Sequence, residues 1–174
     1  MSTSRIPLIL ATAFAFGCSE SAVAPTAESN GPMLAGSAVI HRVSVGGPDA
    51  CAAFGEKPGC DANFSLTAVQ RVDGSVTGEG QDQLSHIHGG TGVHVQIDCL
   101  RVIGNQAWVS GVIDHSRVPE LVGGHVIARV QDNGTTANDP PDLISIFEED
   151  TFGGCLAAPD LQLSQAPQGQ VVVR

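Results

Sequence analysis

Residues 93–114 read VHVQIDCLRVIGNQAWVSGVID, and this stretch determines the fold class of the chain. Apolar and polar residues alternate over its first half, which is typical of a strand with one buried face. The residues predicted to share the apolar face are Val93, Val95, Ile97 and Cys99. Gly104-Asn105 then predicts a two-residue turn, after which residues 106–114 return antiparallel. The stretch therefore predicts a β-hairpin.

Alternation of the same period continues on both sides of this hairpin. Residues 63–72 place Phe64, Leu66 and Ala68 on one face, and Asp73-Gly74 predicts a second two-residue turn into a strand over 75–82. Further strands are predicted over 37–45, 125–131, 143–147 and 171–173, and only 150–157 is compatible with a short helix. We therefore expect an all-β fold, a small antiparallel meander barrel or sandwich of about seven to nine short strands.

The composition agrees with short strands joined by turns. The 174 residues include 21 Gly and 10 Pro but a single Lys, Lys57. This length allows one ordinary domain, which we place at 37–174. The formal net charge of −10 argues against a nucleic-acid partner, because few cations are present to neutralise a phosphate backbone.

The N-terminus has the features of a secretory signal peptide over residues 1–17. Arg5 precedes an apolar run over 6–16, and this run of about 11 residues is too short to span a bilayer as a helix. It ends in Ala15-Phe16-Gly17-Cys18, which resembles the lipobox of bacterial lipoproteins. Ordinary cleavage after Ala24 is the alternative.

Lipidation of Cys18 would make a membrane the first partner of this protein. Ser19 follows the cysteine, and by the same resemblance a residue other than Asp at this place permits sorting to the outer membrane. Residues 18–36 are rich in Ser, Ala, Pro and Glu, so they would form a flexible tether. We expect an exported lipoprotein of the bacterial cell envelope, anchored in the outer membrane.

The cysteine count fits this interpretation. Of five cysteines, assigning Cys18 to lipid leaves an even number, and an even number in an exported chain predicts two disulfides. Among the three connectivities we favour Cys51–Cys60 and Cys99–Cys155. The longer of these loops should stabilise the fold by about 4 kcal/mol in the chain-entropy model. A metal site is the alternative, but none of the spacings is Cys-x-x-Cys.

Several phrases of the chain occur together in a known group of sequences. They are SLTAVQRVDGSVTG (65–78), HVQIDCL (94–100), GNQA (104–107), VQDNG (130–134) and PPD (140–142). As a set they resemble an uncharacterised group of secreted bacterial β-domains, many of which have lipoprotein signals. The resemblance covers roughly residues 64–155 and implies an all-β fold with these hairpin registers. It implies no activity.

The segment HIHGGTGVH, residues 86–94, is the first candidate for chemistry. His86 and His88 would share a face if this segment is a strand, and His94 would join them across the Gly-rich bend. Three convergent imidazoles would bind Zn or Cu, and His115 and His125 are further candidates. We favour the alternative of solvent-exposed loop histidines, because no complete ligand spacing is present.

The segment DNGTTANDPPD, residues 132–142, is the second candidate. The oxygen donors that Ca²⁺ prefers are Asp132, Asn133, Asp139 and Asp142. Their spacing is not that of an EF-hand, and the same residues have a simpler interpretation in turn chemistry. Asn-Gly reverses the chain, Asp and Asn cap it, and the prolines make it rigid. We favour the turn over the calcium site.

Catalytic motifs are missing from the sequence. It contains no Gly-x-Ser-x-Gly elbow, no phosphate-binding loop and no His-Glu-x-x-His, and the carboxylate run 148–150 is predicted to be a solvated strand end. Trp108 is expected in the core, and Arg101 and Arg129 as solvated or paired strand residues.

The leading hypothesis is a non-enzymatic β domain with a binding or structural role, for which the sequence identifies no protein or glycan partner. The alternatives are a small Zn or Cu domain or metalloenzyme, and a carbohydrate-binding module, which one Trp and no Tyr make less favourable.

Overall fold

The computed structural model describes residues 38–47, 62–84, 92–136, 138–166 and 169–174. Within these residues it contains ten strands and two short 3-10 turns, η3 and η4, with no α-helix and no helix long and apolar enough to cross a membrane. The elements are β1 (Val39–Gly47), β2 (Ala62–Arg71), β3 (Val76–Leu84), β4 (Val93–Ile103), β5 (Gln106–Ser116), η3 (Pro119–Leu121), β6 (His125–Gln131), β7 (Leu143–Ile144), β8 (Glu148–Glu149), η4 (Cys155–Ala157), β9 (Ser164–Gln165) and β10 (Gln170–Val173).

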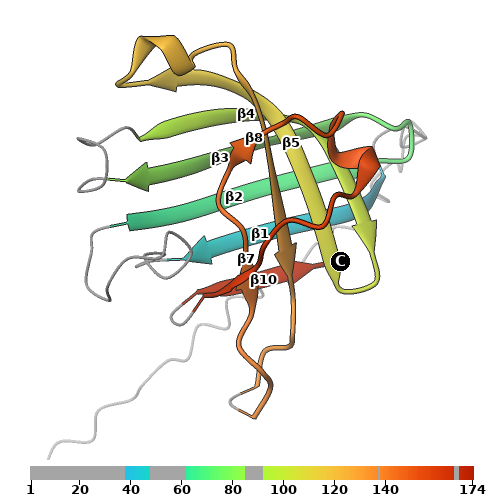
Figure 1. The fold of residues 1–174 in the computed structure, drawn as a ribbon. Coiled ribbons are helices and arrows are strands. Elements are labelled where there is room, and N and C mark those ends of the chain that lie inside the picture. The colour runs from blue at the N-terminus through green and yellow to red at the C-terminus, as the bar shows by residue number, and fades with distance from the viewer. Residues whose placement is uncertain (1–37, 48–61, 85–91, 137, 167–168) are drawn as a thin grey trace, which may run out of the picture. The chain divides into compact units, whose positions relative to one another are not determined.

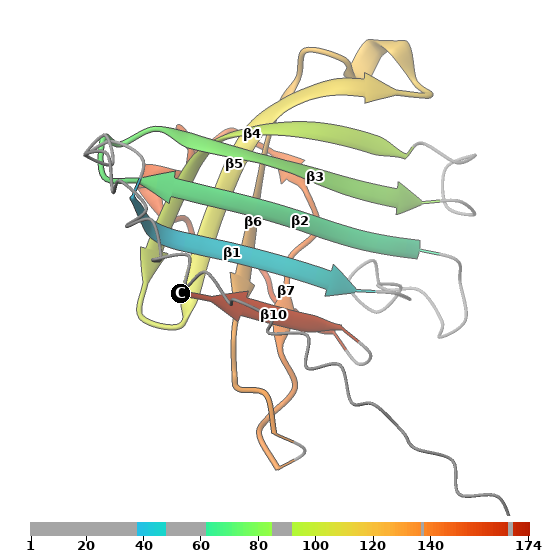
Figure 2. The same ribbon diagram turned by 180° about the vertical axis from the view of Figure 1, so that it is seen from behind.

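The strands form one antiparallel sheet in the order β10-β1-β2-β3-β4-β5-β6-β7-β9, and β8 pairs with β6 (Figure 1). From β1 to β7 each strand pairs with its neighbour in the sequence, so the sheet is a meander. It curls into a half-barrel, and Figure 2 shows β1, β2 and β3 from the opposite side. The predicted all-β antiparallel meander is confirmed.

The interior of the half-barrel is lined by alternate residues of the strands. Phe64, Leu66 and Ala68 of β2 all belong to the buried core, as the period of two predicts. Strand β3 differs, because two of its inward positions are Gly78 and Gly80. Gly78 allows a close approach of the β2 backbone, since a Cβ there would clash with the Thr67 carbonyl oxygen, whereas Gly80 leaves space inside. The ring of Phe147 occupies part of that space and packs against Phe64 with 5.2 Å between ring centroids.

The predicted orientation of Cys99 is wrong. A β-bulge at Asp98 breaks the register between β4 and β5, so that Ile97 pairs with Gly111 while Cys99 pairs with Ser110. The extra residue reverses the alternation, and Leu100 joins Ile97 in the core while Cys99 turns to the outer face. There it forms the predicted disulfide with Cys155.

The two predicted hairpin turns have different outcomes. The turn at Gly104-Asn105 has two residues, since Ile103 pairs with Gln106, and Gly104 has a φ of +61°. The turn at Asp73-Gly74 is longer than predicted. The backbone N–H of Gly74, with a φ of +83°, donates to the carbonyl of Arg71, and a three-residue loop results. Asp73 accepts a hydrogen bond from the Ser75 N–H instead of adopting positive φ.

The segment over residues 150–163, here called the C-terminal strap, packs on the outer face of β4, β5 and β6 (Figure 1). The Cys99–Cys155 disulfide holds its η4 turn. The indole N–H of Trp108 donates to the Pro159 carbonyl at 2.8 Å. Arg129 stacks over the Trp108 ring and pairs with Asp160. Both faces of β5 are therefore buried in its middle.

Candidate functional site

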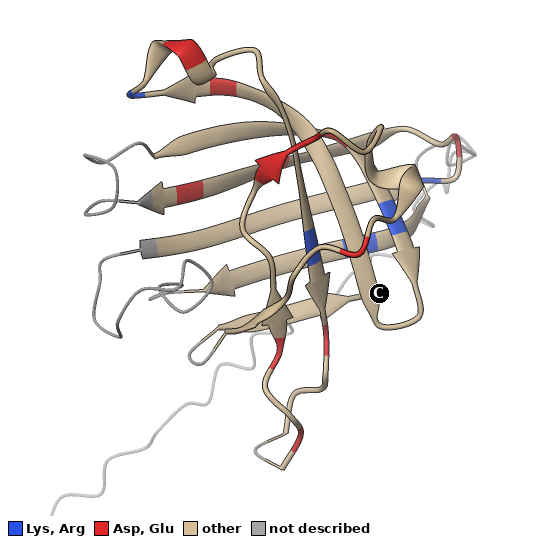
Figure 3. Cartoon of the chain, viewed as in Figure 1, with Lys and Arg blue, Asp and Glu red and all other residues tan. Residues whose placement is uncertain are grey.

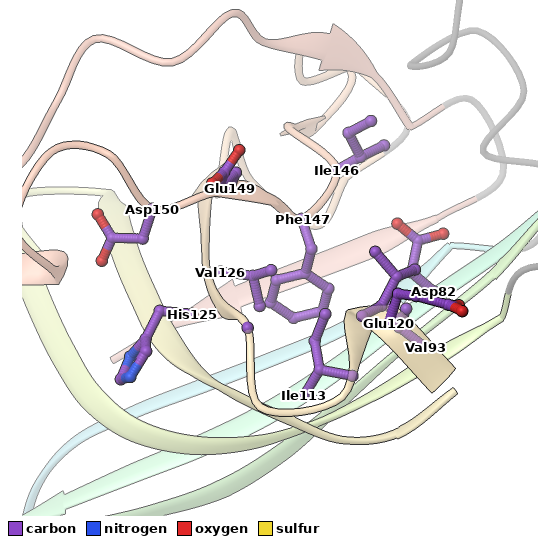
Figure 4. A pocket seen from close by; sticks show the side chains of 12 residues that line it. Asp82, Val93, Ile113, Glu120, His125, Val126, Ile146, Phe147, Glu149 and Asp150 are labelled. Atoms are coloured by element: carbon purple, nitrogen blue, oxygen red, sulfur yellow. The ribbon is translucent and has the colours of Figure 1, made fainter. Parts of the chain in front are cut away.

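A pocket lies at the end of the sheet where β3 and β5 end and β4 and β6 begin. Its volume is about 510 Å³, which is within the range of small-molecule sites. The walls come from those strand ends, from the η3 loop and from the segment 146–150. Figure 4 shows the Phe147 ring between two polar groups, with Asp82 and Glu120 on one side and His125 and Asp150 on the other.

Most of the wall area of this pocket is apolar. The side chains are Val93, Ile113, Leu121, Val126, Ile146 and Phe147. Val126 and Ile113 also belong to the core of the half-barrel, so this part of the wall is a continuation of the packed interior. A ligand with an apolar body would therefore lose water-exposed surface on entry, which is the main source of affinity in such sites.

Asp82 is the exception in this apolar wall. It occupies an inward position of β3, between Phe64 on β2 and Val93 on β4, and the residue is 3% exposed. Burial raises the pKa of its carboxyl from 3.8 to about 7, while the backbone N–H of Phe147 acts in the opposite direction. No described residue donates a hydrogen bond to its Oδ1 atom. A buried oxygen without a partner is costly, and such oxygens concentrate at functional sites.

The sequence contains a signal for Asp82, although no catalytic or metal-binding motif includes this residue. Val76, Gly78, Gly80 and Asp82 follow one another at a spacing of two in the predicted strand 75–82, so a carboxyl must share the face of the core. The neighbouring glycine also shapes the site, because a Cβ on Gly80 would lie 2.5 Å from Cζ of Phe147. The ring reaches the pocket only because residue 80 has no side chain.

The rim of the pocket is acidic. Glu120 and Glu149 are exposed, and no hydrogen bond or ion pair from a described residue engages either carboxylate. Asp150 accepts hydrogen bonds at Oδ1 from the backbone N–H groups of Phe152, Gly153 and Gly154. Figure 3 shows acidic positions on η3, on β8 and near the end of β3. The run 148–150, predicted to be a solvated strand end, thus contributes Glu149 and Asp150 to the pocket.

Among the described residues, none of those that line the pocket is a Lys or an Arg. His125 is exposed at the rim. Arg117, which follows β5, is exposed and does not line the pocket. The field in the pocket is therefore negative, and it favours cations over anions.

The histidine cluster is placed only in part. His86 and His88 lie outside the described residues. The imidazole of His94 pairs with Asp114 at 2.5 Å through Nδ1 and lies 3.7 Å from Glu79 through Nε2. A β-bulge brings both Asp114 and His115 opposite His94. Both ring nitrogens of His94 therefore face carboxylates. Among the described residues no group of three or more His, Cys, Asp or Glu is arranged to hold a metal ion.

The predicted calcium loop connects β6 to β7, and its oxygens accept from backbone amides. Asp132 accepts from Gly134 N–H at 3.0 Å and from Val173 N–H at 3.0 Å. Asp142 accepts from Asn133 N–H at 2.8 Å and from Val171 N–H at 2.7 Å.

Two more contacts complete this loop. The Asn133 side-chain amide donates to the carbonyl of Pro141, and Asp139 accepts from Thr136 N–H. This backbone hydrogen bond from Thr136 lowers the pKa of Asp139. Each of the four predicted ligands therefore makes a hydrogen bond within the loop, and Asp132 and Asp142 also accept from β10.

Cys18, Cys51 and Cys60 lie outside the described residues, as do the predicted signal peptide and tether. Of the residues that the structure describes, Asp82 and its apolar surroundings form the strongest candidate site. Their shape and charge suit an apolar ligand that carries a donor or a positive charge. Comparison with models of known protein families, with curated proteins and with solved structures finds no match for this chain.

Proposed function

We propose that this chain is an exported, outer-membrane-anchored β domain that binds a small molecule in the pocket beside Asp82. The observation that carries the binding role is the cavity of about 510 Å³, with an apolar wall and a buried carboxyl oxygen to which no described residue donates a hydrogen bond. The export signal and Cys18 support the location, because a lipidated N-terminus followed by a tether would hold the domain at the membrane surface. The role proposed is binding and not catalysis.

The binding role is tested with N-phenyl-1-naphthylamine, a neutral apolar dye whose fluorescence rises when water is excluded. The folded domain should bind it saturably. Ile146→Trp should abolish binding, because Ile146 lines the pocket and the larger side chain would fill it. The control is Ile103→Trp, since Ile103 is 47% exposed at the end of β4 and does not line the pocket. Equal binding by both variants, or no binding by the wild type, would contradict the proposal.

The location is tested separately. Mass spectrometry of the mature protein should find an acylated N-terminal Cys18, and Cys18→Ala should release the domain from the membrane fraction. An unmodified N-terminus beginning at Pro25 would show cleavage after Ala24 and refute the lipid anchor.

A further inference from the structure

Asp82 gives the pocket a chemical preference. This step rests on the proposed binding role and names the class of ligand. We propose that the pocket recognises a cationic amine, with its ammonium group against the Asp82 carboxylate and its apolar body against the strand ends. Three observations independent of one another lead to this assignment: an unpartnered oxygen, an acidic rim and an apolar wall.

The first observation is the position of the unpartnered oxygen. Oδ1 of Asp82 is buried and receives no hydrogen bond from any described residue, although Asp82 lines an open cavity. A small rotation of the carboxyl would turn Oδ1 toward the cavity, where an ammonium group of a ligand would supply the missing donor and the opposite charge at once. A charge-assisted hydrogen bond of this kind is about twice as strong as a neutral one.

The second observation is the charge of the surrounding elements. The titratable groups around Asp82 are Glu120 on η3, His125 on β6, Glu149 on β8 and Asp150 after it. Three of these four are carboxylates, and the part of the lining that the structure describes contains no Lys or Arg. An anionic ligand would meet repulsion on entry, whereas a cation would be attracted to the rim before reaching Asp82.

The third observation is the apolar surface around the carboxyl. Val93 pairs with Asp82 across β3 and β4, and Phe147 and Ile113 complete the wall. A hydrated metal ion fits this surface less well than an organic cation does, because the ion retains its water ligands and makes no favourable contact with apolar walls. An organic amine would donate a hydrogen bond to the carboxyl and would also bury its apolar body against the wall.

Isothermal titration calorimetry with two matched probes tests this assignment. 1-Naphthylmethylamine is cationic at pH 8, and 1-naphthylmethanol has the same ring with a neutral hydroxyl group. The wild type should bind the amine at least about tenfold more tightly. Asp82→Asn should remove that preference and leave the affinity for the alcohol unchanged. Asp98→Asn is the matched control, because Asp98 is exposed on the bulge of β4 and its loss changes the net charge equally.

The affinity for the amine should also depend on pH. The pKa of Asp82 is about 7, so below this pH its carboxyl is protonated in the empty pocket. Binding of the ammonium group must then displace the proton. The affinity for the amine should therefore fall by up to tenfold for each unit by which the pH lies below about 7. The affinity for the alcohol should not follow this profile. Asp82→Asn should bind the amine with the same affinity at pH 6 and pH 8.

Each outcome separates this inference from the proposed binding role. Equal affinity for both probes, unchanged by Asp82→Asn, would refute ammonium recognition and leave the pocket as a binding site. If Asp98→Asn lost the preference for the amine as fully as Asp82→Asn does, the preference would come from the net negative charge of the chain, and the role of Asp82 would be overturned. Failure of both probes and of N-phenyl-1-naphthylamine would overturn the binding role itself.

Discussion

Asp82 links the proposed binding role to the stability of the fold. Its carboxyl is surrounded by Phe64, Val93 and the ring of Phe147, in a place where an apolar residue would pack without cost. Burial of an ionised carboxyl without full hydrogen bonding destabilises a protein. The site therefore lowers the stability of the empty domain, as binding sites commonly do.

Asp82→Asn should stabilise the domain at alkaline pH. The folded protein holds the proton of Asp82 up to pH about 7, whereas the unfolded chain releases it near 3.8. The stabilisation from this proton is thus complete below pH 3.8 and is lost as the pH rises to about 7. Over this window the wild type should lose stability relative to the variant, by roughly 1.4 kcal/mol for each pH unit at most.

Chemical denaturation of the wild type and of Asp82→Asn at pH 5 and pH 8 measures this difference in stability. The Asp98→Asn variant serves as control, and its denaturation midpoint should follow that of the wild type at both pH values. A difference between wild type and Asp82→Asn that is the same at pH 5 and pH 8 would show that the pKa of Asp82 is not raised.

Gly80→Ala should disturb the pocket from the opposite side. The new Cβ would lie 2.5 Å from Cζ and 2.8 Å from Cε2 of Phe147, so the ring must move. We expect a loss of about 1–3 kcal/mol in stability, as for other overpacked cores, and a changed affinity for N-phenyl-1-naphthylamine. Gly46→Ala on β1 is the control, because a Cβ there meets nothing within 4 Å. Two variants with equal midpoints and equal dye affinity would contradict this placement of Phe147.

At the scale of elements, the edge of the sheet at β10 is closed by side chains. Val171 and Val173 are two residues apart on β10, and their N–H groups point away from β1. Asp142 accepts from the first and Asp132 from the second, at 2.7 and 3.0 Å. These carboxylates therefore take the place of a neighbouring strand, and they protect an edge that would otherwise be open to pairing with another chain.

Asp142→Ala should destabilise the domain by about 1–3 kcal/mol, because it leaves the N–H groups of Asn133 and Val171 without partners. Hydrogen exchange should become faster at the Val171 amide. The control is Asp139→Ala, which removes a carboxylate that bonds within its own loop, and its effect should be smaller. EDTA should leave the melting temperature of the wild type unchanged. A fall in that temperature that Ca²⁺ reverses and Zn²⁺ does not, and that is absent from Asp142→Ala, would instead establish a calcium site in this loop.

The elements also show what the sequence could predict and what it could not. Strands β4 and β6 begin and end as predicted, because β6 and the first half of β4 alternate in sequence and Gly104-Asn105 fixes the end of β4. The bulge at Asp98 escaped prediction, since alternation alone cannot show an extra residue that depends on the partner strand. The strands β8 and β9 have two residues each and exist only through pairing with β6 and β7.

Only the first two residues of the predicted strand 143–147 form a strand, and the reason again lies in distant parts of the chain. Leu143 and Ile144 pair with β6 and β9, whereas Ile146 and Phe147 leave the ladder and line the pocket. Their apolar character is visible in the sequence, but the space that receives Phe147 comes from Gly80, more than sixty residues earlier. A pocket assembled from segments so far apart has no local pattern.

At the scale of the whole molecule, the C-terminal strap joins the pocket to the outer face of the sheet. It begins at Asp150 on the pocket rim and continues through η4, where Cys155 is bonded to Cys99. The buried Trp108, which is the only Trp of the chain, lies beneath it and donates to the Pro159 carbonyl. The disulfide thus closes a loop that contains β5, β6 and the pocket segment 146–150.

Replacing both Cys99 and Cys155 by Ser should release the strap and lower the stability by about 4 kcal/mol, since the disulfide joins residues 56 positions apart. Emission from Trp108 should shift to longer wavelength as the strap leaves the indole. Either local detachment of the strap or global unfolding could cause this shift in emission, and dye binding distinguishes between them. Local detachment would preserve part of the N-phenyl-1-naphthylamine binding, because the strand ends remain, whereas global unfolding would abolish it.

The control for this experiment is the double serine variant of Cys51 and Cys60, which removes the predicted shorter loop. Its effect on stability should be smaller, because chain-entropy stabilisation grows with loop length, and the emission of Trp108 should not change. An unchanged emission in the Cys99 and Cys155 variant would instead mean that Arg129, stacked on Trp108 and paired with Asp160, holds the strap without the disulfide. In that case the pocket rim would depend on β6 and not on the covalent link.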